Sequence, residues 1–193
     1  TSPPGFRPMS EVEDVWDSMS ERVVDMITFS LRDTKNAKVF VEAKTAIHTF
    51  IRTLESFEFS VSRLNALVLS FFRRFAQLLR ERFAADFQQA IREAQHQPMI
   101  VNDATELAKV LSVCWLKPGE AEQLGKQPFP LSLPFSQTYP LCCMDIRSLV
   151  EQYYSFSQGM TQYHQEVDAI LSQSLDDLLI QLISVNIRDT VEQ

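Results

Sequence analysis

The sequence predicts an all-α protein: an elongated antiparallel bundle or rod of about five main helices and no sheet. The clearest signal is the stretch from Val61 to Ile91, which holds no Pro or Gly and repeats apolar residues every three or four positions. At about 1.5 Å per residue this helix would be about 45 Å long. Gly, which disfavours helices, occurs only 4 times in 193 residues. We therefore expect the other helices to pack along this one.

Three helices are predicted in residues 10–95. A capping box at Ser10-Glu11-Val12-Glu13 would begin the first, which runs from about Glu11 to Leu31. The second, from about Ala37 to Leu54, has the same apolar spacing, and the third is the long helix. Because only a few residues link them, neighbouring helices should pack antiparallel.

Residues 96–139 are predicted to form a long crossover, because they hold five of the nine prolines of the chain. One short helix is expected in it, from Asn102 to Leu111, with Asn102 as the N-cap. Large apolar side chains such as Trp115 and Phe135 should pin the crossover to the bundle. Whether residues 117–127 are ordered is left open by the sequence.

Two more helices are predicted in residues 140–193. Pro140 suits the first turn of a helix, where its missing amide costs nothing, and this helix should reach about Phe156. Gly159 would end it, and the last helix would run from about Gln162 onward. With residues 1–9 as a Pro-rich tail, we expect a three-helix part, a crossover and a two-helix part, all within one segment of a larger helical-rod protein.

Composition excludes several classes of protein. A net charge of −7 and a pI near 5.0 argue against general nucleic-acid binding, which needs a basic surface. No apolar run approaches the length of a membrane span, and no charged-then-apolar leader opens the sequence. Three cysteines, two of them adjacent, form no disulfide framework, which fits a reducing compartment.

The sequence lacks the patterns of catalytic, cofactor and metal sites. The four glycines are scattered, so no phosphate-binding loop is predicted. The cysteines and histidines do not have the spacing of metal ligands; these residues are Cys114, Cys142, Cys143, His48, His96 and His164. We expect the three cysteines to be packed in the core. No Ser or Cys nucleophile motif is present, and His164 with Asp168 is better explained as a solvated surface pair. We therefore expect no catalytic, cofactor or metal residues, and no enzyme.

One candidate partner surface lies on the long helix. Arg73, Arg74 and Arg80 place positive charge on an otherwise acidic protein, and Arg pairs well with carboxylates of another chain. The simpler interpretation is a solvated or intramolecularly paired face. Phe71 and Phe72 are adjacent, so we also expect that one of them meets a neighbouring segment or a partner.

Three stretches carry a family resemblance. Residues 53–65, TLESFEFSVSRLN, lead into a long helix that continues through LLRERFAADF to Phe87. Residues 129–137, FPLSLPFSQ, are a proline-broken segment, and residues 166–179, EVDAILSQSLDDLL, are a predicted helix. In this order they resemble the vesicle-facing subunit of the exocyst, called complex component six in vertebrate naming.

The resemblance implies a helical-rod fold and a non-enzymatic role in tethering and docking secretory vesicles at the plasma membrane. It implies contacts with other exocyst subunits and, through the full-length protein, with a vesicle Rab GTPase. The GTPase contact is expected C-terminal to this chain, so no Rab-contact residue is assigned. A cytoplasmic location, peripheral to secretory vesicles and sites of exocytosis, is also implied.

Two alternatives remain open at this point. The chain could be a helical segment of another multisubunit tethering complex, since related tethers share such helices. It could also be a small all-α ligand- or lipid-binding bundle, which would need a closed apolar pocket with convergent polar groups.

Overall fold

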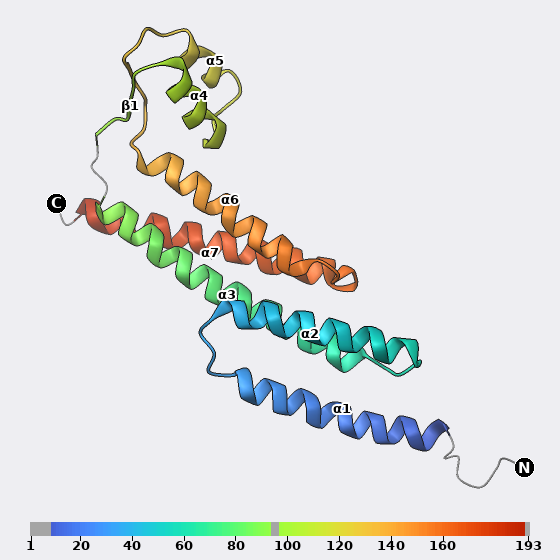
Figure 1. Cartoon of the computed structure of the whole chain (residues 1–193). Helices are drawn as coiled ribbons and strands as arrows, with labels where there is room; N and C mark the ends of the chain where they lie inside the picture. The colour runs from blue at the N-terminus through green and yellow to red at the C-terminus, as the bar shows by residue number, and fades with distance from the viewer. Residues whose placement is uncertain (1–8, 94–96, 192–193) are drawn as a thin grey trace, which may run out of the picture. The chain divides into compact units, whose positions relative to one another are not determined.

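The computed structural model of the chain describes residues 9–93 and 97–191 (Figure 1). The regular secondary structure of this described part is helical apart from one two-stranded sheet, which confirms the all-α class. The elements in order are α1 (Met9–Leu31), α2 (Ala37–Ser56), α3 (Ser62–Glu93), β1 (Ile100–Val101), α4 (Ala104–Val113), α5 (Glu120–Gly125), β2 (Leu131–Ser132), α6 (Thr138–Ser157), the 3₁₀ turn η1 (Thr161–Tyr163) and α7 (His164–Val191).

The five long helices, α1, α2, α3, α6 and α7, lie where the hydrophobic periodicity predicts them. Gly159, with φ of +82°, takes the left-handed conformation in the turn after α6, as a helix-ending glycine does. At the other end of the chain, α1 begins at Met9, so Ser10 lies inside the helix and the predicted capping box is wrong. Residues 1–8 of the predicted tail and His96 lie outside the described residues.

The crossover holds more regular structure than predicted. Asp103, not Asn102, is the N-cap of α4, because its carboxylate accepts hydrogen bonds from the amides of Thr105 and Glu106, both at 2.8 Å. A second short helix, α5, falls within the stretch whose order the sequence left open. The expectation of no sheet is also wrong, since β1 and β2 pair antiparallel, with Val101 opposite Leu131.

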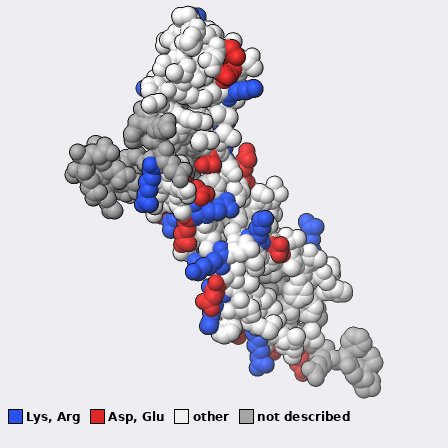
Figure 2. Space-filling view, turned by 60° about the vertical axis from the view of Figure 1, so that its left-hand side comes forward, with Lys and Arg blue, Asp and Glu red and all other residues white. Residues whose placement is uncertain are grey.

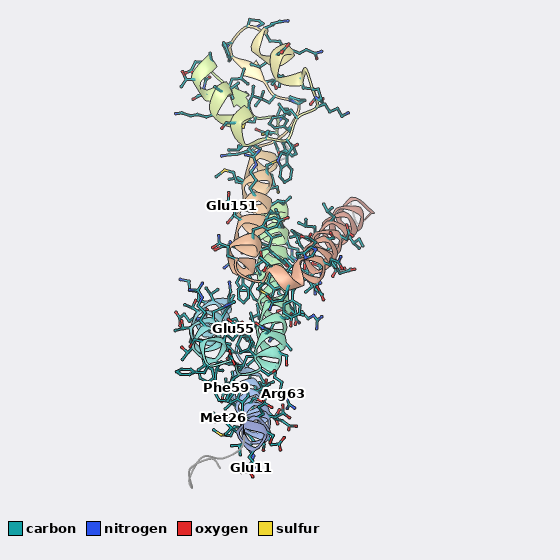
Figure 3. The ribbon with its side chains drawn as sticks, turned by 90° about the vertical axis from the view of Figure 1, so that its right-hand side faces the viewer. Glu11, Met26, Glu55, Phe59, Arg63 and Glu151 are labelled. Atoms are coloured by element: carbon teal, nitrogen blue, oxygen red, sulfur yellow. The ribbon has the colours of Figure 1, made fainter. Side chains whose placement is uncertain are left out.

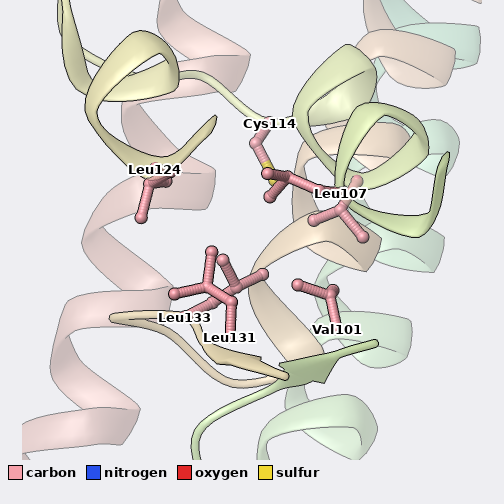
Figure 4. Close-up of a cluster of buried hydrophobic side chains, with 7 residues drawn as sticks. Val101, Leu107, Cys114, Leu124, Leu131 and Leu133 are labelled. Carbon is pink, nitrogen blue, oxygen red and sulfur yellow. The ribbon is translucent and has the colours of Figure 1, made fainter. Parts of the chain in front are cut away.

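A small hydrophobic core of its own holds the crossover together (Figure 4). Alternation along the paired strands turns Val101 and Leu131 inward, whereas Ile100 and Ser132 face solvent. The short helices α4 and α5 close the cluster from the other side, and its buried members are Val101, Leu107, Val110, Cys114, Leu124, Leu131 and Leu133.

The chain forms two compact units, each built from two separate stretches of sequence. The first unit comprises Thr1–Leu78 and Phe156–Ile170, and the second comprises Leu79–Ser155 and Leu171–Gln193. The predicted division into a three-helix part, a crossover and a two-helix part follows the order of the sequence and stays a prediction.

An aromatic cluster forms the core of the first unit. Phe156, at the end of α6, stacks on Phe75 with ring centroids 4.6 Å apart, and its ring is 5.5 Å from that of Phe72. One turn before Phe75, Phe71 packs edge-on against Phe40 of α2, with ring centroids 5.5 Å apart. Both Phe71 and Phe72 are buried against neighbouring segments, α2 and the end of α6, which confirms this alternative of the expectation.

Lys44 of α2 is buried in the first unit and binds the end of α6. Its ammonium donates to the main-chain oxygen of Phe156 and, at 2.7 Å, to that of Gln158. The last carbonyls of a helix have no intrahelical partner, so a buried cation is well placed there. Burial lowers the pKa of Lys44, and these two hydrogen bonds offset part of the cost of desolvating its charge.

Candidate interaction surfaces

The three arginines predicted as a partner surface lie in different environments. Arg80 is paired within the second unit: its Nη1 binds Asp177 Oδ2 of α7, with side-chain exposures of 27% and 30%. Gln173 donates to the other oxygen of Asp177 at 2.7 Å, which fixes the carboxylate. Arg80 therefore contributes to packing between α3 and α7, in addition to any role at a surface.

Arg74 and Arg73 belong to the part of α3 in the first unit. Arg74 is half-buried and donates from Nη1 to Gln77 Oε1 at 2.9 Å, while its Nε is buried without a hydrogen-bond partner. Arg73 is exposed. The three guanidinium groups therefore differ in exposure and in pairing. Their role in partner binding stays a prediction.

A polar pocket lies beside Lys44 in the first unit. Residues at i, i+4 and i+8 of α2, Lys44, His48 and Arg52, line it together with Gln158 and Gly159. Burial lowers the pKa of His48, and the nearby positive charges of Lys44 and Arg52 lower it further. The pocket offers cations and hydroxyl groups, but its lining includes no Ser or Cys nucleophile and no carboxylate.

The cysteines are free thiols packed into the second unit. Cys114 and Cys143 are buried and Cys142 is half-buried, as predicted for packed cysteines. Burial, with the nearby Asp145 charge, raises the pKa of Cys142 to about 11, so its thiol stays protonated and weakly nucleophilic at neutral pH. Within residues 9–93 and 97–191 no three His, Cys, Asp or Glu side chains come together as metal ligands would.

Charge on the surface is mixed. On the face shown in Figure 2, Lys and Arg residues stand among Asp and Glu residues. Among the described helices, none is long and apolar enough to cross a membrane.

A surface that the sequence did not reveal lies on α1. Val15, Met19, Met26 and Phe29 are exposed, and among the described side chains of this helix only Ser20 is buried. Hydrophobic periodicity places Val15, Met19 and Met26 on one apolar face of this helix, but periodicity alone cannot tell which part of that face the protein itself covers. Arg63 of α3 binds Asp17 of α1. In Figure 3 the labels of Met26 and Arg63 lie on opposite sides of α1.

Comparison with known proteins places the chain in a family. The family model for the exocyst complex subunit Sec15 C-terminal region matches residues 63–193. The chain is 24% identical to exocyst complex component SEC15 of Saccharomyces cerevisiae over 189 residues, covering 95% of this chain and 21% of that protein. It is 28% identical to exocyst complex component sec15 of Schizosaccharomyces pombe over 153 residues, covering 79% of this chain and 19% of that protein.

An animal relative gives a similar result. The chain is 24% identical to exocyst complex component 6 of Rattus norvegicus over 172 residues, covering 89% of this chain and 21% of that protein. The chain thus spans about a fifth of the length of the curated relatives it matches, and no solved structure matches it. Because the family model covers more than half of the chain, this helical protein belongs to the Sec15 family of exocyst subunits.

Proposed function

We propose that the chain is a non-enzymatic scaffold segment of an exocyst subunit, which helps to tether and dock secretory vesicles at the plasma membrane through protein–protein contacts. The match of residues 63–193 to the Sec15 family carries this proposal. The packed helices support it, because they provide long side faces for partners. The protein would act in the cytoplasm, peripheral to vesicles and to sites of exocytosis.

Affinity purification of the full-length parent protein tests the proposal. Other exocyst subunits should copurify with it in near-stoichiometric amounts. Phe75→Ala, which empties part of the aromatic core, should reduce their recovery and slow secretion of a reporter cargo. Phe75→Leu, which keeps an apolar side chain in place, is the matched control. Normal secretion in cells that lack the parent protein, together with no copurifying exocyst subunit, would contradict the proposal.

Arg73, Arg74 and Arg80 remain the proposed partner surface on α3. Arg73 is the clean test, because reversing Arg80 would also break its pair with Asp177. An exposed Arg adds little affinity, but it raises the association rate at low salt. We expect Arg73→Glu to slow association with the other subunits at low ionic strength and to have little effect at high ionic strength. Lys38→Glu, an exposed reversal on α2, is the control; equal association rates for both variants would leave Arg73 without this role.

The proposed GTPase partner belongs to the full-length protein. We expect a vesicle Rab loaded with a GTP analogue to bind the full-length protein and to bind the 193-residue chain weakly or not at all. Binding of equal strength to both would place the contact within this chain.

A further inference from the structure

α1 has an uncovered apolar stripe, formed by Val15, Met19, Met26 and Phe29. At 3.6 residues per turn these side chains fall within about 80° of the helix circumference and extend over about 21 Å. Met26 is 64% exposed and Phe29 is 66% exposed. Apolar side chains gathered on one exposed helix face, here with Arg22 between Met19 and Met26, mark an interaction site more often than single exposed residues do.

The stripe is not needed to hold α1 in its unit, because other side chains of the helix do this. Trp16 packs on Phe50 and Phe59 and donates to the main-chain oxygen of Ser60 at 2.8 Å. Arg63 of α3 binds Asp17 at 2.9 Å and Glu21 at 3.4 Å. The apolar stripe lies on a different part of the helix circumference from Asp17 and Glu21 and is exposed, with the guanidinium of Arg32 4.2 Å from the centre of the Phe29 ring.

An acidic edge runs beside the stripe. With six acidic residues and one basic residue, α1 has a net charge of −5, whereas the whole chain has −7. Glu11, Asp14 and Asp25 lie along one side of the stripe and are exposed, and none of the ion pairs among the described residues involves them. The single base, Arg22, lies within the stripe.

The apolar stripe and the acidic edge beside it together indicate what kind of partner binds this face of α1. A second copy of α1 would bring like charges together, and an anionic lipid surface would be repelled by the acidic edge. An amphipathic helix with basic residues satisfies both features, because its apolar face covers the stripe and its cations pair with the carboxylates. We propose that the apolar stripe of α1 binds such a basic amphipathic helix, contributed by another exocyst subunit; this inference rests on the proposed function.

The geometry defines the helix that fits. About four helical turns are needed to cover the stripe, with apolar residues at i, i+3 or i+4 and i+7. Lys or Arg should follow on the side that faces Asp14 and Asp25. The two methionines have flexible, polarizable side chains, which lets the stripe adapt to aliphatic or aromatic residues of the partner.

Site-specific photo-crosslinking in the assembled exocyst tests the inference. Benzoylphenylalanine is placed at Met26 or Phe29 of the full-length protein, and the crosslinked peptides are identified by mass spectrometry. The control position is Thr28, which is exposed on another side of the same helix. We expect crosslinks from Met26 and Phe29, but not from Thr28, to one amphipathic segment of another subunit with net positive charge.

The acidic edge is tested in the same assay. The reversal E11K/D14K/D25K should lower the crosslinking yield by at least about tenfold, and the neutral variant E11Q/D14N/D25N should lower it less. Reversing three exposed acids elsewhere in the same unit, in E42K/E166K/D168K, should leave the yield unchanged. A circular dichroism spectrum of each variant checks that the helices are retained.

Several outcomes would overturn the inference: no crosslink, a crosslink within the same polypeptide, a crosslink to a second copy or to lipid, or a partner segment of net negative charge. Recovery of the other exocyst subunits is measured in the same samples. If the complex assembles without the expected crosslink, the inference fails and the proposed function stands. If no exocyst subunit copurifies, the proposed function itself fails.

Discussion

At the scale of single residues, α3 carries the side chains on which the packing of both units depends. Phe75 is buried against Phe156 in the first unit, and Leu79, one turn further along, is buried in the second. Truncating either leaves a space that its neighbours can only partly fill, so the loss exceeds the transfer free energy of the removed atoms.

We expect Phe75→Ala to lower the free energy of unfolding by about 3–5 kcal/mol and Leu79→Ala by about 2–5 kcal/mol. Urea denaturation followed by circular dichroism measures both. Arg73→Ala, at an exposed position of the same helix, should stay within about 0.5 kcal/mol of the unsubstituted protein. Unchanged midpoints for Phe75→Ala and Leu79→Ala would mean that the assigned inner face of α3 is wrong.

Asp145 of α6 is a half-buried acid in the second unit. Burial, followed by the charge of Asp86, raises the pKa of Asp145 above its ordinary value of 3.8. Between that value and the raised pKa, the folded state holds a proton that the unfolded state has released. Folding stability therefore falls as pH rises through this window, and the penalty is fully present at neutral pH.

We expect Asp145→Asn to raise the free energy of unfolding at pH 7 by about 0.5 kcal/mol, because it removes a charge that is partly buried and lies near the charge of Asp86. The gain should decline as pH falls through this window and vanish well below pH 3.8, where Asp145 is protonated in both states. Glu151→Gln, at an exposed position of α6, is the matched control for the change from carboxylate to amide. An equal gain at pH 7 and pH 3 would mean that it does not come from the charge of Asp145.

At the scale of elements, the N-terminus of α4 illustrates a choice that spacing alone did not decide. Asn102 and Asp103 are both good N-caps, and the apolar periodicity fits either start. The structure uses Asp103 as the cap, while the amide of Asn102 donates to the carboxylate of Glu106 at 2.7 Å. The pattern resembles a capping box, in which the N-cap side chain binds the amide three residues later and that later side chain binds back. Here the carboxylate of Glu106 binds back to the amide of Asn102, the residue before the N-cap Asp103.

We expect Asp103→Ala to cost about 1 kcal/mol of stability, because two amides of the first turn lose their acceptor. The shift of the urea midpoint at unchanged slope measures this loss. Thr105→Ala, an exposed substitution in the same turn, should have little effect. If both variants have the same midpoint, the cap contributes no stability.

The sequence predicted the long helices well and the crossover poorly, for physical reasons. A long amphipathic helix repeats its signal over many turns, so α1, α2, α3, α6 and α7 were found within a few residues of their ends. The strands β1 and β2 have two residues each, too short for a period to appear, and their pairing joins residues about 30 positions apart. For the same reason the sequence could not show that Lys44 meets Phe156, or which part of the α1 face stays uncovered.

At the scale of the whole molecule, helix is the dominant secondary structure, and we expect folding not to depend on a bound metal ion. We expect a far-ultraviolet circular dichroism spectrum dominated by helix, since strand covers only four described residues. We expect the melting temperature to be the same with and without a strong chelator, because no cluster of metal ligands occurs among the described side chains. A strand-dominated spectrum, or a large drop in melting temperature on chelation, would contradict these expectations.

The bond between Lys44 and the end of α6 has a consequence during protein synthesis. Lys44 and Phe156 are 112 residues apart in the sequence, and Phe156 also supplies the aromatic ring on which Phe75 stacks. At about 5–20 residues per second, a ribosome adds Phe156 about 6–22 s after Lys44. During that interval Phe72 and Phe75 of the nascent α3 lack the ring of Phe156, against which they pack in the folded unit. The first unit is therefore expected to need protection by chaperones until residues 156–170 have left the ribosome.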